Sequence, residues 1–407
     1  MESVVPAIWA VSFFTLFIGI FWISVYYLKK EKRETLDKGN LPSVTVLIPA
    51  YNEEKNIKSC LDSIFNLDYP KNKLKIIVIN DGSTDDTPNI VKRYNGVTLI
   101  NNKFNLGLKV ASLNISLKKV DTDLFGCLDA DSIVTKDSLK KMIHFFQNPK
   151  TGSVINSVMV RDPDNLLRKI QHLEYIFSNF SRRLMSKVDT LYVTPGVLSL
   201  YRTELIKKLG GFDEDNLTED MEIAMRLKYN HYNVKIENRA FTYTVVPGDL
   251  KSHWRQRIRW FRGFIFNSKK YKVMFFNKEY GLMGTFQVPL NVISVALVVL
   301  MFILISYELI KNLYFWILKI VIYKFYILID LPTLRELMMS VNLTVTIPVI
   351  VSFFVGIYIY NKAHVSVKEK WKYPLAIFLC LSIYPILRGL HWIFALIYES
   401  TGAKKIW

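Results

Sequence analysis

The sequence predicts an α/β domain combined with an α-helical transmembrane region, and three observations lead to this fold class. Short β-rich runs alternate with helical stretches between residues 41 and 160, which favours a mainly parallel sheet covered by helices. The 407 residues are 51% hydrophobic, which is too apolar for one soluble domain of this length. Long apolar runs lie at the N-terminus and through the C-terminal third.

The first apolar run, Val4 to Leu28, is about the length needed to cross a bilayer. The basic residues 29–33 follow it at once, so we expect residues 1–28 to be a span that enters the cytoplasm. A cleaved signal peptide would carry basic residues before the run and small residues after it, and both are missing here. We therefore expect an anchor in the cell membrane, with residues 29–265 as a cytoplasmic domain.

Five strands and four helices are expected in the first part of this domain. The predicted strands are residues 44–49, 75–79, 97–101, 124–128 and 154–160, and the predicted helices are residues 53–65, 84–94, 108–119 and 136–147. A longer helix is expected over residues 165–187, and another from about Asp220 to Tyr229. Parallel sheets of this kind bind ligands at the carboxyl ends of their strands.

Acidic side chains follow the predicted strands at that edge. Glu53 follows the first strand, Asp81 the second, and Asp129 and Asp131 the fourth. Two carboxylates separated by one small residue can both reach a hard cation such as Mg²⁺ or Mn²⁺. The alternative for Asp129 and Asp131 is a solvated turn. Asp81 has two roles open to it: contact with a base or ribose, or capping of the helix expected near Thr84.

Two further motifs lie beyond the predicted strands. Thr218-Glu219-Asp220 is either a helix N-terminus whose acids favour the dipole, or a site where Asp220 accepts the proton of an attacking hydroxyl. In a helix, Gln256, Arg259 and Trp260 share a face. That face would suit a phosphate beside a sugar ring, although a basic interfacial helix has the same composition.

The C-terminal half predicts membrane helices. Apolar runs cover residues 281–306, 313–331, 337–360 and 373–397, and the second, which contains Lys319 and Lys324, is the weakest. We expect three full spans plus one interfacial or re-entrant segment in residues 281–407, reached through an interfacial connector at residues 266–280. The basic loop 362–372 should be cytoplasmic. Arg388 and His391, inside the last run, either line a hydrated path or pair with another helix.

Composition restricts the classes of partner and the compartment that are expected for this protein. A formal charge of +18 favours an anionic lipid surface over nucleic acid in a membrane protein, so no nucleic-acid partner is expected. The three cysteines are too few and too scattered for a disulfide framework, which indicates a reducing compartment.

Five short motifs occur along the chain in an order and spacing that can be compared with known families. They are Ile48-Pro49-Ala50-Tyr51-Asn52-Glu53, Asn80-Asp81-Gly82-Ser83, Asp129-Ala130-Asp131, Thr218-Glu219-Asp220 and Gln256-x-x-Arg259-Trp260. In order and spacing they resemble those of the membrane-bound family 2 glycosyltransferases, a group that includes the poly-N-acetylglucosamine, cellulose, chitin and hyaluronan synthases. The resemblance implies a GT-A fold, a nucleotide-sugar donor that is most often a UDP-sugar, a divalent cation, and inverting transfer that gives a β-linkage.

The resemblance also implies roles on the donor side of the site. Asp81 is similar to the aspartate that contacts uridine, and Glu53 lies in the strip that borders the nucleotide. Asp129 resembles the acid near the diphosphate and Asp131 the acid that holds the metal, to which Asp129 adds a second carboxylate. Lys109 resembles the lysine of a Gly-Lys-Ala element, although Leu108 intervenes here.

On the acceptor side, Asp220 is similar to the catalytic base and Glu219 to its acidic neighbour. Gln256, Arg259 and Trp260 resemble the motif that closes over the diphosphate and places the acceptor sugar. Pro195 and Gly196 occupy the position of the floor of the acceptor site.

Three functions are compatible with this resemblance. The leading hypothesis is a processive synthase that extends a polysaccharide and passes it through its own membrane helices. The second is an enzyme that adds a single sugar to a membrane lipid or polyprenyl phosphate. The third is a transport or polymer-binding protein whose glycosyltransferase domain is inactive.

Overall fold

In the computed structural model, residues 5–29, 41–105, 107, 109–322 and 343–403 are described. Eight strands of this part form one sheet in the order β3-β2-β1-β4-β7-β6-β8-β5. The strands are β1 Val44–Ala50, β2 Leu74–Asn80, β3 Val97–Asn101, β4 Leu124–Leu128, β5 Ile133–Val134, β6 Thr151–Val160, β7 Val197–Arg202 and β8 Asn233–Thr244.

The sheet is parallel over β3, β2, β1 and β4, as predicted, and mixed beyond them. Strand β7 runs antiparallel to both β4 and β6, whereas β6 and β8 are parallel to each other. The sequence predicts β1 to β4 and β6 closely but does not predict β5, β7 or β8. Strand β8 was not predicted because its pairing with β6 is irregular. Its register against β6 shifts between Asn156 and Ser157, which interrupts the alternation of apolar and polar residues.

Helices cover both faces of the sheet. They are α2 Ile57–Phe65, α3 Thr87–Lys92, α4 Lys109–Leu117, α5 Ser138–Met142, α6 Leu166–Lys187, α7 Thr203–Lys208, α8 Glu219–Tyr229 and α9 Leu250–Lys270. Successive residues of β1 point to opposite faces: Val46 packs in the core that includes α2, and Leu47 in the core that includes α4 and α8. Two apolar cores therefore fix the strand ends at which the acidic residues lie.

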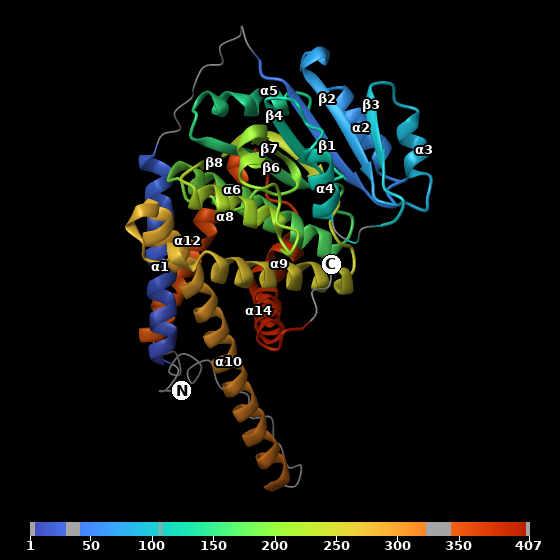
Figure 1. Cartoon of the computed structure of the whole chain (residues 1–407). Helices are drawn as coiled ribbons and strands as arrows, with labels where there is room; N and C mark the ends of the chain where they lie inside the picture. The colour runs from blue at the N-terminus through green and yellow to red at the C-terminus, as the bar shows by residue number, and fades with distance from the viewer. Residues whose placement is uncertain (1–4, 30–40, 106, 108, 323–342, 404–407) are drawn as a thin grey trace.

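The membrane-length helices are α1 Val5–Leu28, α10 Val288–Ile322 with a π-helical turn at Met283–Gln287 before it, α12 Leu343–Ser366, and the pair α13 Pro374–Ser382 and α14 Tyr384–Ser400. Of these helices, α10 and α14 extend from α9 away from the sheet, while α1 and α12 lie along one edge of the domain (Figure 1). By length and composition, three described helices could cross a membrane, or four if α13 and α14, bent by 46°, form one broken span.

The predicted break between the apolar runs 281–306 and 313–331 was wrong. Helix α10 continues through this region to Ile322. The polar residues there pair along the helix surface, because Lys311 lies 3.5 Å from Glu308 one turn earlier. With its π turn this helix has 40 residues and is about 60 Å long, which exceeds the apolar thickness of a bilayer. The rest of the second run, residues 323–331, lies outside the described residues.

Two other boundaries differ from the expectation. The predicted division between residues 265 and 266 falls inside α9, which runs unbroken to Lys270. The apolar run 373–397 is not one straight helix, because the chain bends between α13 and α14.

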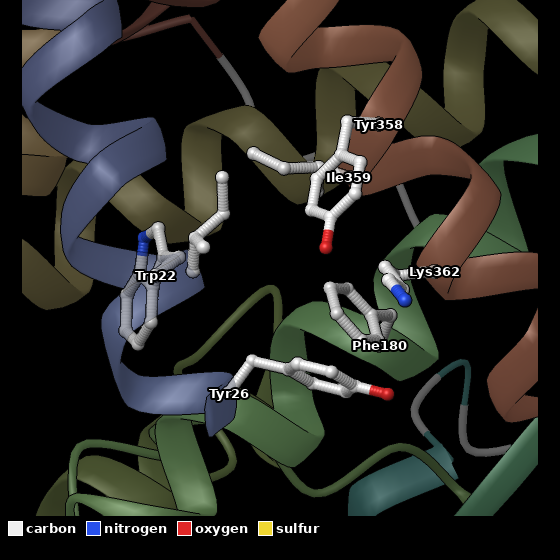
Figure 2. Close-up of a pocket in the computed structure, with 7 residues that line it drawn as sticks. Trp22, Tyr26, Phe180, Tyr358, Ile359 and Lys362 are labelled. Carbon is white, nitrogen blue, oxygen red and sulfur yellow. The ribbon is translucent and has the colours of Figure 1, made fainter. Parts of the chain in front are cut away.

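Helices α1 and α12 pack side by side and contact the sheet domain through α6. Figure 2 shows a small pocket at this junction, lined by Trp22 and Tyr26 of α1, Phe180 of α6, and Tyr358 and Lys362 of α12. The ammonium group of Lys362 lies 5.3 Å from the centre of the Tyr358 ring. At this junction the N-terminal helix contacts both the sheet domain and a C-terminal helix.

Candidate active site

The acids predicted at the strand ends come together at one edge of the sheet. The amide of Asp81, after β2, donates to the carbonyl of Ala50 at the end of β1. Asp81 is buried, and one of its carboxylate oxygens accepts a hydrogen bond of 2.8 Å from Asn102. Helix α3 starts at Thr87 with Asp86 at its N-cap, so Asp81 does not cap it. Of the two roles open to Asp81, capping is excluded.

Lys109 connects the acids at the strand ends to the acids of α8. It is the first residue of α4, and its ammonium group bonds to Asp129 and lies 3.5 Å from Oε1 of Glu219. Burial acts to lower the pKa of Lys109, but the Asp129 and Glu219 carboxylates outweigh it and raise that pKa above its usual range. The lysine is therefore a fixed positive charge between the two groups of acids.

Asp131 is held beside two other carboxylates. One of its oxygens accepts hydrogen bonds from Ser132 at 3.0 Å and from Thr244 at 3.2 Å. Burial, followed by the charge of Asp129, raises the pKa of Asp131 to about 6. Burial also raises the pKa of Glu53, and Asp129 adds to the effect. These carboxylates repel one another, and a divalent cation would relieve that repulsion.

The donor set fits such a cation in type, because hard divalent cations prefer carboxylate oxygens. Within the described residues, no three His, Cys, Asp or Glu side chains converge on one point. A cation at Asp131 and Asp129 would therefore need further oxygen ligands, which the phosphates of a nucleotide commonly provide for Mg²⁺.

Asp220 lies at the start of α8, one residue after Glu219. The amide of Met221 donates to its carboxylate at 2.8 Å. Burial and then the neighbouring Glu219 raise the pKa of Asp220 to about 6, while Arg259 and Lys109 act against them. A carboxylate with a raised pKa near a cluster of charges has the properties that a general base requires.

The segment Thr194-Pro195-Gly196 connects the two sides of the site. Thr194 donates from its amide and its hydroxyl to the carbonyl oxygen of Asp220, while the amide of Asp129 donates to the carbonyl of Gly196 at 2.9 Å. A Cβ atom at Gly196 would overlap the ammonium group of Lys109 and lie 3.1 Å from both carboxylate oxygens of Asp129. This position therefore accommodates only glycine without a shift of its neighbours.

Helix α9 carries the Gln256 to Trp260 motif, and Arg259 of this motif contacts the segment that leads into α8. Nη1 of Arg259 donates to the carbonyl of Leu217 at 3.0 Å, just before the acids of α8. The guanidinium group on the indole of Trp260 belongs to Arg257, at 4.3 Å, so Arg259 does not fill that place. Oε1 of Gln256 is buried and has no hydrogen-bond partner among the described residues, which leaves an acceptor for a ligand hydroxyl.

Sequence reasoning missed Glu174, Tyr384 and Arg257. Glu174 lies in α6 and bonds to Arg257 of α9 and to Tyr384 of α14. Arg388 is 3.9 Å from Glu174, and the buried ring of His391 packs against Trp254. Arg388 therefore pairs with another helix, one of its two predicted alternatives. The available signal was the presence of Arg388 in an apolar run, because such a charge needs a partner.

Part of the chain is similar to proteins of a known family. Residues 45–210 match the family "Glycosyl transferase family 2". The Poly-beta-1,6-N-acetyl-D-glucosamine synthases of Staphylococcus epidermidis and Staphylococcus aureus are each 33% identical to the chain over 265 residues. The alignment covers 62% of this chain and 64% of each of these relatives, which is less than two thirds of their length.

One solved structure has the same fold over nearly the whole chain. It is a mannosyltransferase from Pyrobaculum calidifontis in complex with GDP-Man and Mn²⁺, with a TM-score of 0.64, 20% sequence identity and 99% coverage of both chains. The likeness includes the membrane-length helices as well as the sheet domain. Residues 45–210 of this chain therefore match the glycosyl transferase family 2, the chain also contains helices that could span a membrane, and it is similar to the poly-beta-1,6-N-acetyl-D-glucosamine synthases.

Proposed function

We propose that this protein transfers a sugar from a UDP-sugar, such as UDP-GlcNAc or UDP-Glc, to a growing β-linked polysaccharide and translocates the product across the membrane. The observation that carries this proposal is the segment Thr194 to Gly196, which bonds to Asp220 on one side and to Asp129 on the other. A base and a diphosphate-binding acid are thereby held at a fixed separation. The similarity to polysaccharide synthases supports the choice of product.

In the proposed reaction, a hydroxyl of the acceptor sugar attacks the anomeric carbon of the donor. The bond from that carbon to the diphosphate oxygen breaks, and Asp220 takes the hydroxyl proton. Attack opposite the leaving group inverts the anomeric centre. Glu219 keeps Lys109 between the two groups of acids, 3.5 Å from its own carboxylate.

The leaving diphosphate gathers negative charge that the site has to stabilise. Asp131 and Asp129 would hold Mg²⁺ or Mn²⁺, which would supply positive charge next to the diphosphate. Arg259, held by the carbonyl of Leu217, adds a second positive charge. On the nucleoside side, Asp81 and Glu53 would accept hydrogen bonds from the base and ribose.

The acceptor sugar would lie between α9 and the Thr194 to Gly196 segment. Trp260 supplies an aromatic surface for the sugar ring, and the unpartnered Oε1 of Gln256 accepts from a sugar hydroxyl. Pro195 and Gly196 form the floor. Helices α10 and α14 extend from α9 away from the sheet (Figure 1), and we propose that the product passes between the membrane-length helices. The catalytic domain would be cytoplasmic and the protein a multi-pass protein of the cell membrane.

A donor screen tests this proposal. Purified protein with Mg²⁺ or Mn²⁺ should release nucleotide diphosphate from a UDP-sugar in preference to GDP-sugars. Asp220→Asn should abolish transfer and still bind the donor, because the carboxamide cannot accept the proton. Unchanged turnover in Asp220→Asn would exclude Asp220 as the base.

A second candidate is the addition of one sugar to a membrane lipid or polyprenyl phosphate. One observation favours it. In the described residues, α10 buries only Val288, Pro289 and Leu290, so most of this long helix does not pack against other helices. A narrow set of helices offers less room to enclose a polymer. A product with one added sugar on a lipid would select this candidate.

A further inference from the structure

Three helices meet at one carboxylate oxygen. Oε2 of Glu174, in the middle of α6, accepts a hydrogen bond of 2.7 Å from Nη2 of Arg257 in α9. It accepts another of 2.9 Å from the hydroxyl of Tyr384 in α14. The side chains of Glu174 and Arg257 are only 18% and 5% exposed, so solvent hardly screens this ion pair.

Arg257 continues from this ion pair to the aromatic residue of the acceptor site. Its guanidinium carbon lies 4.3 Å from the centre of the Trp260 ring, and its Nε donates to Nε2 of His253 at 3.2 Å. A planar guanidinium group stacks on an indole and bonds in its own plane at the same time. The orientation of the Trp260 ring is therefore coupled to the position of the Glu174 carboxylate.

The charges of these groups support the same arrangement. Burial acts to raise the pKa of Glu174, but the positive charges of Arg257 and Arg388 outweigh it and lower the pKa below its usual value. Burial, together with Arg257, lowers the pKa of His253 to about 4. At neutral pH Glu174 is ionised and His253 is neutral, so both accept hydrogen bonds from Arg257.

We propose that Glu174 and Arg257 are positioning residues for the acceptor sugar. They fix the indole of Trp260 and tie it to Tyr384, the first residue of α14, next to the 46° bend between α13 and α14. The inference rests on the proposed role of Trp260 in acceptor binding. Arg257 occupies a position that the Gln-x-x-Arg-Trp motif leaves unspecified, and Glu174 lies far from any motif. Because Trp260 and Tyr384 are connected through Arg257 and Glu174, a displacement of the acceptor sugar and a change of the bend would affect the same contacts.

Glu174→Gln tests the proposal on the purified full-length chain. The amide keeps an oxygen for Arg257 but loses the charge, so the guanidinium group and the indole lose their fixed orientation. Two reactions are compared: transfer to a short soluble oligosaccharide of the product, and release of nucleotide diphosphate with water as the acceptor. The KM for the oligosaccharide should rise by about tenfold or more, while hydrolysis of the donor stays within about twofold of the wild type. An equal fall of both reactions, or no change in either, would overturn the proposal.

Arg257→Lys provides a second variant that keeps the charge and loses the planar group. The Arg257→Lys variant should raise the KM for the acceptor as Glu174→Gln does. It also tests the proposal if Glu174→Gln fails to fold. A wild-type acceptor KM in Arg257→Lys would contradict the role of stacking.

Glu369→Gln is the matched control. Glu369 lies in the segment after α12 and bonds at 2.9 Å to His172, which is in α6 like Glu174. It therefore connects α6 to another segment, as Glu174 does, but within the described residues it forms no hydrogen bond or ion pair with Arg257 or Trp260. The KM of the Glu369→Gln variant for the acceptor should stay at the wild-type value. A rise equal to that of Glu174→Gln would mean that any loosening of α6 has this effect, and the proposal would fail. Absence of transfer by the wild type would instead contradict the proposed function, so the two failures are distinguishable.

Discussion

Thr194 fixes the backbone of Asp220 through two hydrogen bonds to one oxygen. The amide of Thr194 donates to the carbonyl of Asp220 at 3.1 Å and its hydroxyl donates at 2.7 Å. The hydroxyl of Tyr201 in turn donates to the hydroxyl of Thr194 at 2.9 Å. The first turn of α8, which carries the proposed base, is thus connected through Thr194 to β7.

Thr194→Val should lower kcat and leave the donor affinity unchanged. Valine keeps the shape of threonine but removes the hydroxyl, so the Asp220 carbonyl loses one bond and the buried Tyr201 hydroxyl loses its acceptor. We expect a loss of about 1–3 kcal/mol in the free energy of unfolding. Thermal unfolding and initial rates at saturating donor provide the measurements. A variant with wild-type stability and kcat would show that this contact does not position α8.

The rate should fall as the pH drops through about 6, the value to which burial and Glu219 raise the pKa of Asp220. A base works only when deprotonated, so activity is present above this pKa and lost below it. Glu219→Gln removes a like charge and should move this acid limb to lower pH. The profile of kcat against pH measures the shift. Glu214→Gln, at an exposed position, serves as the control; an unmoved limb in Glu219→Gln would contradict the assignment.

Chelation of divalent cations should stop transfer, and added Mn²⁺ or Mg²⁺ should restore it. Asp131→Asn removes a proposed ligand, so the metal concentration that gives half-maximal activity should rise by at least about tenfold. Titration of Mn²⁺ by electron paramagnetic resonance measures binding without relying on activity. Asp162→Asn, whose carboxylate is 89% exposed, should bind Mn²⁺ like the wild type. Equal binding by Asp131→Asn and the wild type would remove Asp131 from the proposed metal site.

Gly263→Ala should impair both stability and transfer. An alanine Cβ at this position of α9 would overlap the side chain of Thr218, which precedes the acids of α8. Alanine usually favours a helix over glycine, so a loss of about 1–3 kcal/mol here would come from overpacking. Gly356→Ala in α12 is the matched control, because its Cβ would meet nothing within 4 Å. Thermal unfolding of the two variants should separate them, and equal midpoints would contradict the close packing of α9 on α8.

The sequence predicted those parts of the site that depend on local order along the chain. Asp81 and Asp129 each follow an apolar strand, and the carboxyl ends of parallel strands share one edge. Their convergence could be predicted without coordinates. The helix that begins at Glu219 was predictable for a similar reason, because acids favour the first turn of a helix.

The contacts between distant segments could not be predicted in this way. Glu174 and Arg257 are 83 residues apart, and nothing local to α6 selects that partner. An acid in an amphipathic helix is most often solvent-exposed. The extent of α10 was misjudged for another reason: Glu308 and Lys311 interrupt the apolar run but are compatible with a continuing helix. The assignment of membrane sides stays a prediction.

The size of the product tests the central claim most directly. Purified protein is incubated with radiolabelled UDP-GlcNAc and Mn²⁺, with Asp220→Asn as the inactive control, and the product is separated by length with and without a β-specific glycosidase. The account predicts a ladder of long chains that the glycosidase degrades and that Asp220→Asn does not make. A single labelled sugar extracted with lipid, with no ladder at any donor concentration, would contradict it.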